Sequence, residues 1–230
     1  MWQDFYDSFV LNFIKDDRWK YLTNGLAVTL KLTFFAVLLG LVIGFFIAMV
    51  RSTYEKTGKL KILNAICGLY LTVIRGTPVV VQLLIIYFVI FGSVRIDKSL
   101  VAIMAFGINS GAYQAEIFRS GIQSIPKGQV EAGRSLGFNY SQTMTNIIMP
   151  QAVKNVIPTL ANEFIVLLKE TSIAGYIALE DLTKGGDIIR SRTYSAFMPL
   201  MAVAIIYLAL VMLFSQGVKY LERRLKKSER

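Results

Sequence analysis

Three polar residues stand inside otherwise apolar stretches of this chain, and their chemistry suits a polar solute. Arg75, Ser110 and Glu163 lie 14, 11 and 13 residues past the starts of their segments. At helical rise these separations correspond to depths of about 21, 17 and 20 Å in a membrane. A charge at such depth costs about 2.5–3.5 kcal/mol and is by default a functional-site hypothesis. An arginine can grip a carboxylate and a glutamate can hold a cation, which matches an amino acid.

Further polar residues extend this set along two helices. Gln114 lies one turn after Ser110, and a polar stripe recurs at helical spacing in the segment of Glu163. The predicted substrate-binding residues are Arg75, Ser110, Gln114, Asn162 and Glu163. The same residues allow an alternative, in which Arg75 and Glu163 form a structural ion pair that locks two helices together. Gly76 and Pro78 favour the site, because helices broken at mid-depth are tolerated against a cavity and mark binding sites in transporters.

The segments that must position these residues are apolar and long. The chain has 230 residues, of which 54% are hydrophobic and only 17% charged, so it is predicted to be an integral membrane protein. Runs of about 20 apolar residues cross the hydrocarbon layer, and they must be helical because lipid cannot hydrogen-bond the backbone. We therefore predict an all-α bundle, one domain over residues 1–230, with five transmembrane helices. The predicted spans are about 22–51, 60–92, 99–122, 150–169 and 195–219.

The remaining segments flank this predicted bundle of residues 22–219. Aromatic residues in segment 1–21 predict a helix lying in the membrane interface, and residues 220–230 form a basic tail. Loop 171–193 is predicted to hold a short helix and a turn, with Gly185-Gly186 at the turn, in place of a sixth span. Gln82 and Asn109 are expected to hydrogen-bond between helices, and Glu116 and Arg119 to pair one turn apart.

Basic residues predict the orientation. Fourteen of the 25 lysines and arginines fall on the side that holds the 119–150 loop and the C-terminus, and nine fall on the other side. The richer side is expected to be cytoplasmic, which places the N-terminus outside. Because the positive charges flank the apolar spans, the net charge of +10 indicates membrane topology and not nucleic-acid binding.

Several chemistries lack the residues they need. The sequence has no histidine and a single cysteine, Cys67, so no metal site and no disulfide are expected. No G-x-x-x-x-G-K-[ST] phosphate loop occurs, so we expect no cofactor in this chain and no ATP bound by that route.

The largest polar segment on the predicted cytoplasmic side is a knob at residues 126–145. Pro126 suits the first position of a short helix, and Gly137 suits its left-handed stop. Ser141 is a candidate cap for a second short helix, and Pro150 is expected to open the fourth span. An ordinary solvated loop would have the same composition. A docking surface for a partner is the alternative, and the sequence pattern of residues 131–150 favours it.

The stretch EAGRSLGFNYSQTMTNIIMP resembles the permease signature of ABC importers, which reads Glu-Ala-Ala, three residues, Gly, nine residues, Ile, one residue, Leu-Pro. Two positions depart from it, Gly133 for alanine and Met149 for leucine, and Gly133 is expected to loosen the first short helix. Four other stretches resemble the polar amino acid branch of that family, at residues 24–33, 75–83, 112–133 and 162–175.

The resemblance implies a type I importer permease of the histidine, glutamine and arginine kind, in a bacterial or archaeal cytoplasmic membrane. It implies two separate ATPase subunits that bind ATP and Mg, a second permease copy or a paralogue, and an extracytoplasmic amino-acid-binding protein. The signature implies that the cytoplasmic loop inserts a coupling helix into an ATPase. The predicted ATPase-coupling residues are Glu131, Ala132, Gly133, Ser135 and Gly137.

Three functions are weighed on these grounds. A permease for polar amino acids leads, and the extra acid Glu163 favours arginine, lysine or histidine while glutamine stays open. An amino acid transporter or channel driven by an ion gradient is the alternative, although no inverted repeat is seen. A membrane scaffold without transport leaves the charges at mid-depth unexplained.

Overall fold

In a computed structural model, which describes residues 2–227 and the side chains up to Leu225, every element is a helix. The fold is all-α over these residues, as predicted. The elements are α1 (Trp2–Phe9), η1 (Val10–Ile14), η2 (Lys15–Asp17), α2 (Trp19–Thr57), α3 (Lys61–Gly76), α4 (Val79–Leu84), η3 (Ile85–Ile90), α5 (Lys98–Gln123), α6 (Lys127–Ser135), α7 (Tyr140–Thr143), η4 (Met144–Ile148), α8 (Met149–Glu170), η5 (Thr171–Ile177), α9 (Leu182–Thr193) and α10 (Phe197–Lys227).

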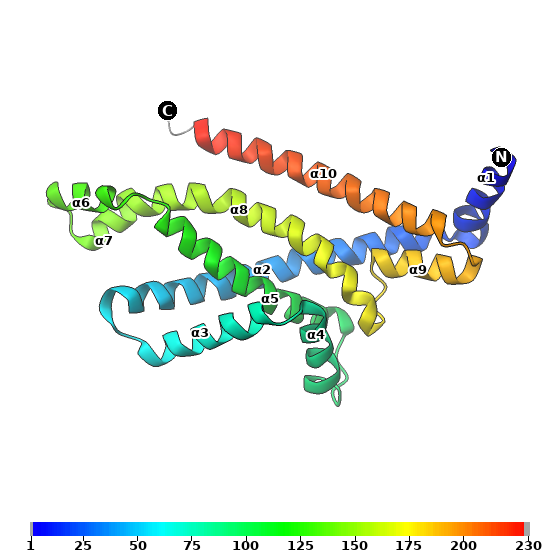
Figure 1. Cartoon of the computed structure of the whole chain (residues 1–230), viewed down its shortest axis with the longest axis horizontal. Coiled ribbons are helices and arrows are strands. Elements are labelled where there is room, and N and C mark those ends of the chain that lie inside the picture. Colours follow the sequence, from blue (N-terminus) through cyan, green and yellow to red (C-terminus); the bar gives the residue numbers. More distant parts are fainter. Residues whose placement is uncertain (1, 228–230) are drawn as a thin grey trace.

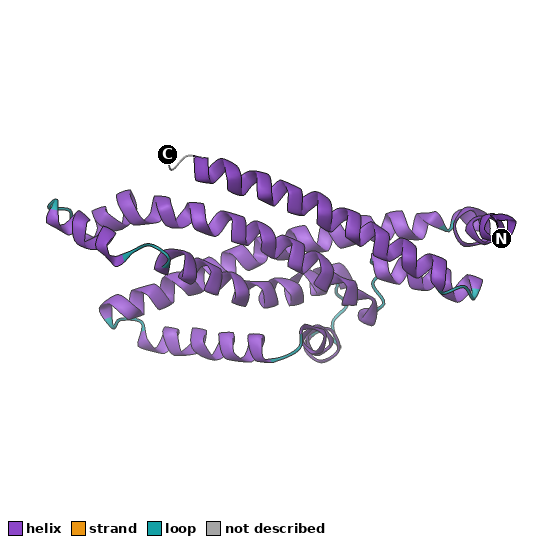
Figure 2. Cartoon of the chain, turned by 45° about the horizontal axis from the view of Figure 1, so that its top comes forward, coloured by secondary structure: helices purple, strands orange, loops and turns teal. Residues whose placement is uncertain are grey.

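The long helices lie side by side along the longest axis of the molecule (Figure 1). One end holds α6, α7 and the turn from α2 to α3, and the other end holds α1 and α9. Figure 2 shows that the connections between the helices are short. The described ends of the chain lie at opposite ends of the bundle, which agrees with an odd number of passes. The sidedness of the membrane stays a prediction.

The number of spans also stays a prediction. Two of the described helices, α2 and α10, are each long and apolar enough to cross a membrane, and the bent pair formed by α3 with α4 and η3 adds a third if it counts as one span. Helices α5 and α8 are long enough but more polar. Polar residues on these two helices face other helices, so a test of composition alone does not count α5 and α8 as membrane spans.

Helices α2 and α5 form the central seam, and small residues allow them to approach closely. A Cβ atom added at Gly44 would lie 2.8 Å from the Cβ of Gln114, and one added at Gly111 would lie 2.8 Å from Ile43. Membrane helices lack a hydrophobic drive to associate and use such residues for close packing. Beside this seam lies a core of buried apolar side chains that includes Leu32, Leu83 and Phe106.

The second predicted span is broken in the middle. Helix α3 ends at Gly76 and α4 begins at Val79, with a bend of 109° between the two halves. Gln82 bonds backbone carbonyl groups beside the break: its Nε2 donates to the Ile74 carbonyl at 2.7 Å and to the Thr77 carbonyl at 3.0 Å. Asn109 donates to Gln82 Oε1 at 3.0 Å, which confirms the predicted interhelical bond and fixes the break against α5.

The segment after α8 contains the predicted short helix but differs in its turn. A 3₁₀ helix runs over Thr171–Ile177, and the turn lies at Ala178, in the left-handed region at φ 54°. Gly185 and Gly186 lie inside α9 and not at a turn. They are needed for packing, because a Cβ at Gly185 would meet the Tyr21 backbone of α2 and one at Gly186 would meet Val203 of α10.

Candidate functional site

A buried polar cluster joins α5 to α8 in the middle of the bundle. Ser110 donates through Oγ to Oε1 of Glu163 at 3.1 Å, and Gln114 Nε2 donates to Ser110 Oγ at 2.9 Å. The same amide lies 3.3 Å from the Val37 carbonyl of α2. Ser110 and Gln114 are fully buried, whereas Glu163 is partly exposed. The structure therefore brings together three of the five predicted substrate-binding residues.

This cluster contains a carboxylate without a cation. Among the described residues, no lysine or arginine forms an ion pair with Glu163. In addition, Oε1 of Gln114 is buried without a hydrogen-bond partner. Buried polar groups are normally paired, so an unpaired acceptor beside a carboxylate marks a place for a donor from outside the chain. The Arg75–Glu163 ion pair considered above is not formed.

Arg75 belongs to a second, charged cluster between α3 and α5. Its Nη1 lies 3.9 Å from Glu116 Oε1, and its guanidinium lies 5.7 Å from the centre of the Tyr113 ring. Arg119 holds the other oxygen of Glu116 through two hydrogen bonds of 3.0 and 2.8 Å, which confirms the predicted pair one turn apart. The Arg75 side chain stays 45% exposed. The sequence did not indicate Glu116 as its partner, because the two residues are 41 positions apart and meet only through the α3 break.

Asn162 faces away from Glu163. It lines a polar cavity of about 510 Å³ between α8 and α10, together with Asn155, Thr159 and Ser215. The predicted polar stripe of α8 is thus divided between two faces, because neighbours in sequence point about 100° apart on a helix. Asn162 lies on the face of α8 that points to α10, and Glu163 lies on the face of α8 that points to α5.

The predicted cytoplasmic knob is well defined by its caps. Pro126 precedes α6, and Gly137 adopts φ 84° after it, as its left-handed stop requires. The cap of the second short helix is Asn139 and not Ser141: its side chain accepts from the Gln142 N–H, and the Gln142 side chain accepts from the Asn139 N–H, both at 2.9 Å. From Tyr140 the chain continues through α7 and η4 into α8 without a loop, so Pro150 lies within a longer helical run and does not begin it.

Gly133 lies at the contact between the two short helices, and its expected loosening of α6 stays a prediction. It is buried at the contact of α6 with α7 and η4, where an added Cβ would lie 2.7 Å from Thr143 and 3.1 Å from Ile147. Alanine, the usual residue of the signature, would therefore require the Thr143 and Ile147 side chains to shift here. The other predicted coupling residues, Glu131, Ala132, Ser135 and Gly137, are exposed.

Sequence reasoning missed one feature of the knob. Leu136 is 75% exposed, although it lies in a polar segment outside the predicted spans, and Phe138 is 38% exposed. An apolar side chain that neither lipid nor core covers is a candidate contact for a protein partner. The signal was present in the sequence as a leucine just before the glycine stop.

The chain belongs to a known family. Residues 37–227 match the family described as "Binding-protein-dependent transport system inner membrane component". An arginine transport system permease protein of Bacillus subtilis is 36% identical over 212 residues, covering 91% of this chain and 94% of that protein. A Rickettsia typhi protein provisionally named as a glutamine transport system permease is 38% identical over 207 residues, covering 89% and 93%.

Solved structures agree with this assignment. A crystal structure of an amino acid ABC transporter with histidines contains a chain 43% identical to this one, with a TM-score of 0.83 and coverage of 89% of this chain and 94% of that chain. A chain of the MetNI methionine ABC transporter, seen in inward-facing conformations, has a TM-score of 0.76 at 19% identity and shows the same fold. The fold is that of an ABC importer permease.

Proposed function

We propose that this chain forms the translocation pathway of an ATP-driven importer for polar amino acids, and that basic amino acids are its preferred substrates. The family name and relatives named for arginine and glutamine transport support the class of solute. The single observation that carries the preference is the Glu163 carboxylate, which accepts from Ser110 and has no cationic partner among the described residues. A relative named for L-cystine transport, 34% identical over 214 residues, shows that similarity alone does not select the amino acid.

The residues have separate tasks in this proposal. Glu163 binds a cationic group of the solute, either the α-ammonium or a basic side chain. Ser110 and Gln114 orient it and complete its hydrogen bonds. Arg75 offers its exposed guanidinium to the α-carboxylate, because its 3.9 Å contact with Glu116 leaves donors available. Asn162 contacts the solute further along, from the cavity between α8 and α10.

The ATPase subunits contact the exposed face of the knob and transmit their conformational change to it. Glu131, Ala132, Ser135 and Gly137 contact a partner ATPase subunit, and Gly133 lies where α6 packs on α7. Because the knob continues into α8 as one helical run, a push on it reaches Glu163 directly. ATP and Mg are bound by two such subunits. A second permease, identical or paralogous, and an external amino-acid-binding protein complete the complex, with the N-terminus outside a bacterial cytoplasmic membrane.

The test is uptake by the whole complex, reconstituted in proteoliposomes with its ATPase and binding protein. We expect Glu163→Gln to lower arginine uptake at least about tenfold, because a hydrogen bond to a charged group is worth about 1.5–3 kcal/mol. If Glu163 binds the basic side chain, which glutamine lacks, glutamine uptake falls less and the ratio of arginine to glutamine uptake drops; an equal fall for both would place the α-ammonium at Glu163 and overturn the preference for basic amino acids. The matched control is Glu170→Gln, which removes an equal charge two turns further along α8. Unchanged arginine uptake in Glu163→Gln would remove this residue from the site.

The same proteoliposomes separate this proposal from a gradient-driven transporter. Uptake should require ATP on the side of the ATPases and should survive an ionophore that collapses ion gradients. Uptake that continues without ATP and stops with the ionophore would favour the alternative.

A further inference from the structure

A second cavity of about 440 Å³ lies on the other side of α8, between α2, α5 and the α7–η4 segment. It is distinct from the Glu163 cluster and from the groove that holds Asn162. Its residues on α2 form one helical stripe, from Phe45 through Met49 to Lys56. Its deep end meets a separate apolar groove of about 500 Å³, because both are lined by Ile157 and Leu160 of α8.

The cavity is graded from apolar to polar along this stripe. Phe45, Met49, Val153 and Leu160 line the part within the bundle. Hydroxyl groups and a lysine line the part at the end of α2, and these residues are Ser52, Thr53, Lys56 and Ser141. A gradient of this kind suits an amphiphile. An amino acid fits poorly, because the apolar end holds no charged side chain to pair with it.

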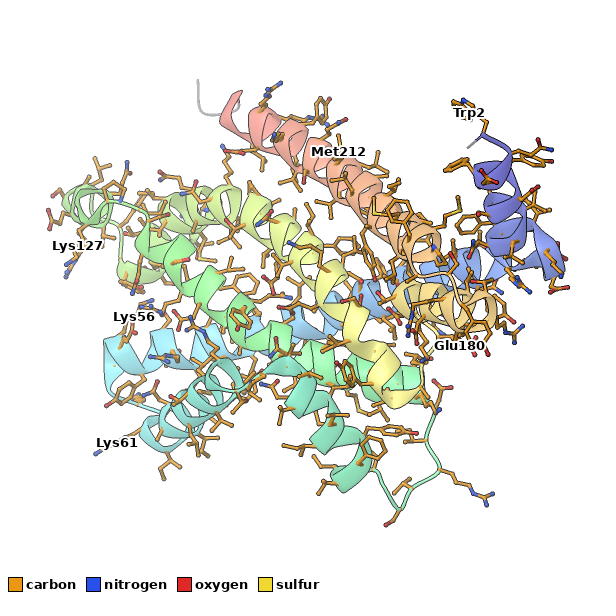
Figure 3. The ribbon with its side chains drawn as sticks, turned by 45° about the vertical axis from the view of Figure 1, so that its right-hand side comes forward. Trp2, Lys56, Lys61, Lys127, Glu180 and Met212 are labelled. Atoms are coloured by element: carbon orange, nitrogen blue, oxygen red, sulfur yellow. The ribbon has the colours of Figure 1, made fainter. Side chains whose placement is uncertain are left out.

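Lys56 supplies the charge at the polar end. Its Nζ lies 4.4 Å from the centre of the Tyr140 ring, so the ring of α7 holds the ammonium at the mouth of the cavity. Figure 3 shows Lys56 at the end of α2, next to the segment that carries α7. Lys56 makes no salt bridge within the described residues, so its charge is available to an anion.

We propose that this cavity binds an anionic phospholipid, with an acyl chain along α2 and the phosphate at Lys56. The length fits: the 11 residues from Phe45 to Lys56 span about 16 Å at helical rise, close to half of the roughly 30 Å hydrocarbon layer. The sign of the charge fits too, since basic residues at the cytoplasmic surface attract anionic lipid. This inference rests on the predicted cytoplasmic side of the knob, and it goes beyond the proposed transport function.

A lipid in this place would touch both the bundle and the knob. Tyr140, Ser141 and Met144 belong to the run that joins the knob to α8, and they line the cavity opposite Phe45 and Met49. The bound lipid therefore bridges α2 to the segment that moves when α8 moves. The transporter complex should retain such a lipid through purification.

The experiment is native mass spectrometry of the whole complex, purified in mild detergent and given equal amounts of phosphatidylglycerol and phosphatidylcholine. Two variants test the site: Lys56→Gln removes the charge, and Val153→Trp fills the apolar part from a position that is 46% exposed and tolerates size. We expect Lys56→Gln to retain about fivefold less phosphatidylglycerol, the equivalent of about 1 kcal/mol per basic residue near the surface, and Val153→Trp to retain less because its side chain occupies the space of the acyl chain. Two controls lie outside the cavity, Lys59→Gln and Val42→Trp, and should retain as much lipid as the unchanged chain.

Three results would overturn the proposal: equal retention in Lys56→Gln and Val153→Trp, equal losses in the controls, or phosphatidylcholine retained as well as phosphatidylglycerol. A photo-crosslinking amino acid at Val153 identifies any other occupant. Crosslinks to lipid support the proposal. Crosslinks to an ATPase subunit or a second permease copy would show that a protein fills the cavity, which also overturns it.

Discussion

Helix α5 carries two polar clusters on different faces, and they differ in how their charge is balanced. On one face Ser110 and Gln114 meet Glu163, a carboxylate with neutral partners only. On the other face Glu116 lies between two arginines, Arg75 at 3.9 Å and Arg119 at 2.8 Å. In the first cluster Ser110 and Gln114 are fully buried and Glu163 is partly exposed, whereas the second cluster is half-exposed.

The difference separates a binding site from a structural ion pair. A carboxylate between two guanidinium groups has its compensation within the chain, so its burial is explained without a ligand. A carboxylate in a buried cluster without a cation needs compensation from elsewhere. We therefore propose that Glu163 selects the solute, whereas Glu116 joins α3 to α5.

The largest effect is expected from Gly40→Ala, which disturbs the Glu163 cluster without changing any charge. The added Cβ would lie 2.6 Å from Gln114 Nε2 and 3.2 Å from Ser110 Cβ. Overpacking costs about 1–3 kcal/mol, and the amide would lose its bond to Ser110 as it moves. We expect arginine uptake to fall about tenfold or more. The control is Gly68→Ala on α3, where an added Cβ meets nothing within 4 Å.

Equal uptake in Gly40→Ala and the unchanged chain, with equal amounts of folded complex, would show that the position of Gln114 does not matter for transport. The cluster would then be a packing feature. A fall in the amount of folded complex alone, with normal uptake per complex, would point the same way.

Much of this arrangement could be predicted from the sequence. Apolar runs placed the starts of the five long segments to within three residues, because a chain in lipid has no alternative to a helix, whereas α2 and α10 run six and eight residues past the predicted ends. The signature also placed the knob. Even the break was indicated, since Gly76 and Pro78 stand beside a charge within an apolar segment, and Gln82 and Asn109 were expected to hydrogen-bond between helices.

The partners of the charged residues could not be predicted in the same way. Depth estimates placed Arg75 and Glu163 at one level, but a depth does not give a direction around the helix axis. The 109° bend turns α4 away and leaves Arg75 beside Tyr113 and Glu116. Similarly, Asn162 and Glu163 are neighbours in sequence yet serve different faces of α8. Which face meets which helix is decided by tertiary packing, which periodicity alone does not report.

A third carboxylate sharpens the comparison, because Asp181 is balanced by backbone N–H groups. It lies between η5 and α9, outside the spanning helices, and caps α9 by accepting from Thr183 and Lys184 N–H at 3.1 Å. Burial raises the pKa of Asp181 from 3.8 to about 6, against the lowering effect of these hydrogen bonds. A raised folded-state pKa means that the folded chain holds the proton more tightly, so stability falls as pH rises from about 4 to about 6 and is level above.

The rise in the pKa of Asp181 corresponds to about 3 kcal/mol, so we expect Tm to fall by about 6–12 °C over that pH range, and Asp181→Asn to flatten the dependence while keeping the cap. Thermal unfolding of the purified complex at a series of pH values measures this. Asp187→Asn is the control, because hydrogen bonds from Arg190 and Lys184 lower the pKa of Asp187 and it should leave the slope from pH 4 to pH 6 in place. A slope that survives in Asp181→Asn would assign the titration to another group.

The smallest effect is expected from Glu116→Gln, and it tests the division most directly. The change leaves Arg75 and Arg119 without their carboxylate, but both side chains are at least 36% exposed, and exposed pairs contribute less than about 1 kcal/mol. Tm should therefore change by less than about 4 °C.

The ratio of arginine to glutamine uptake in the Glu116→Gln variant should change less than about twofold. In the proposed function Arg75 binds the α-carboxylate, which every amino acid carries, so a change beside Arg75 is not expected to distinguish one amino acid side chain from another. A shift in that ratio as large as the one in Glu163→Gln would place both clusters on the selective pathway, and the balance of charge within the chain would then no longer tell a site from an ion pair.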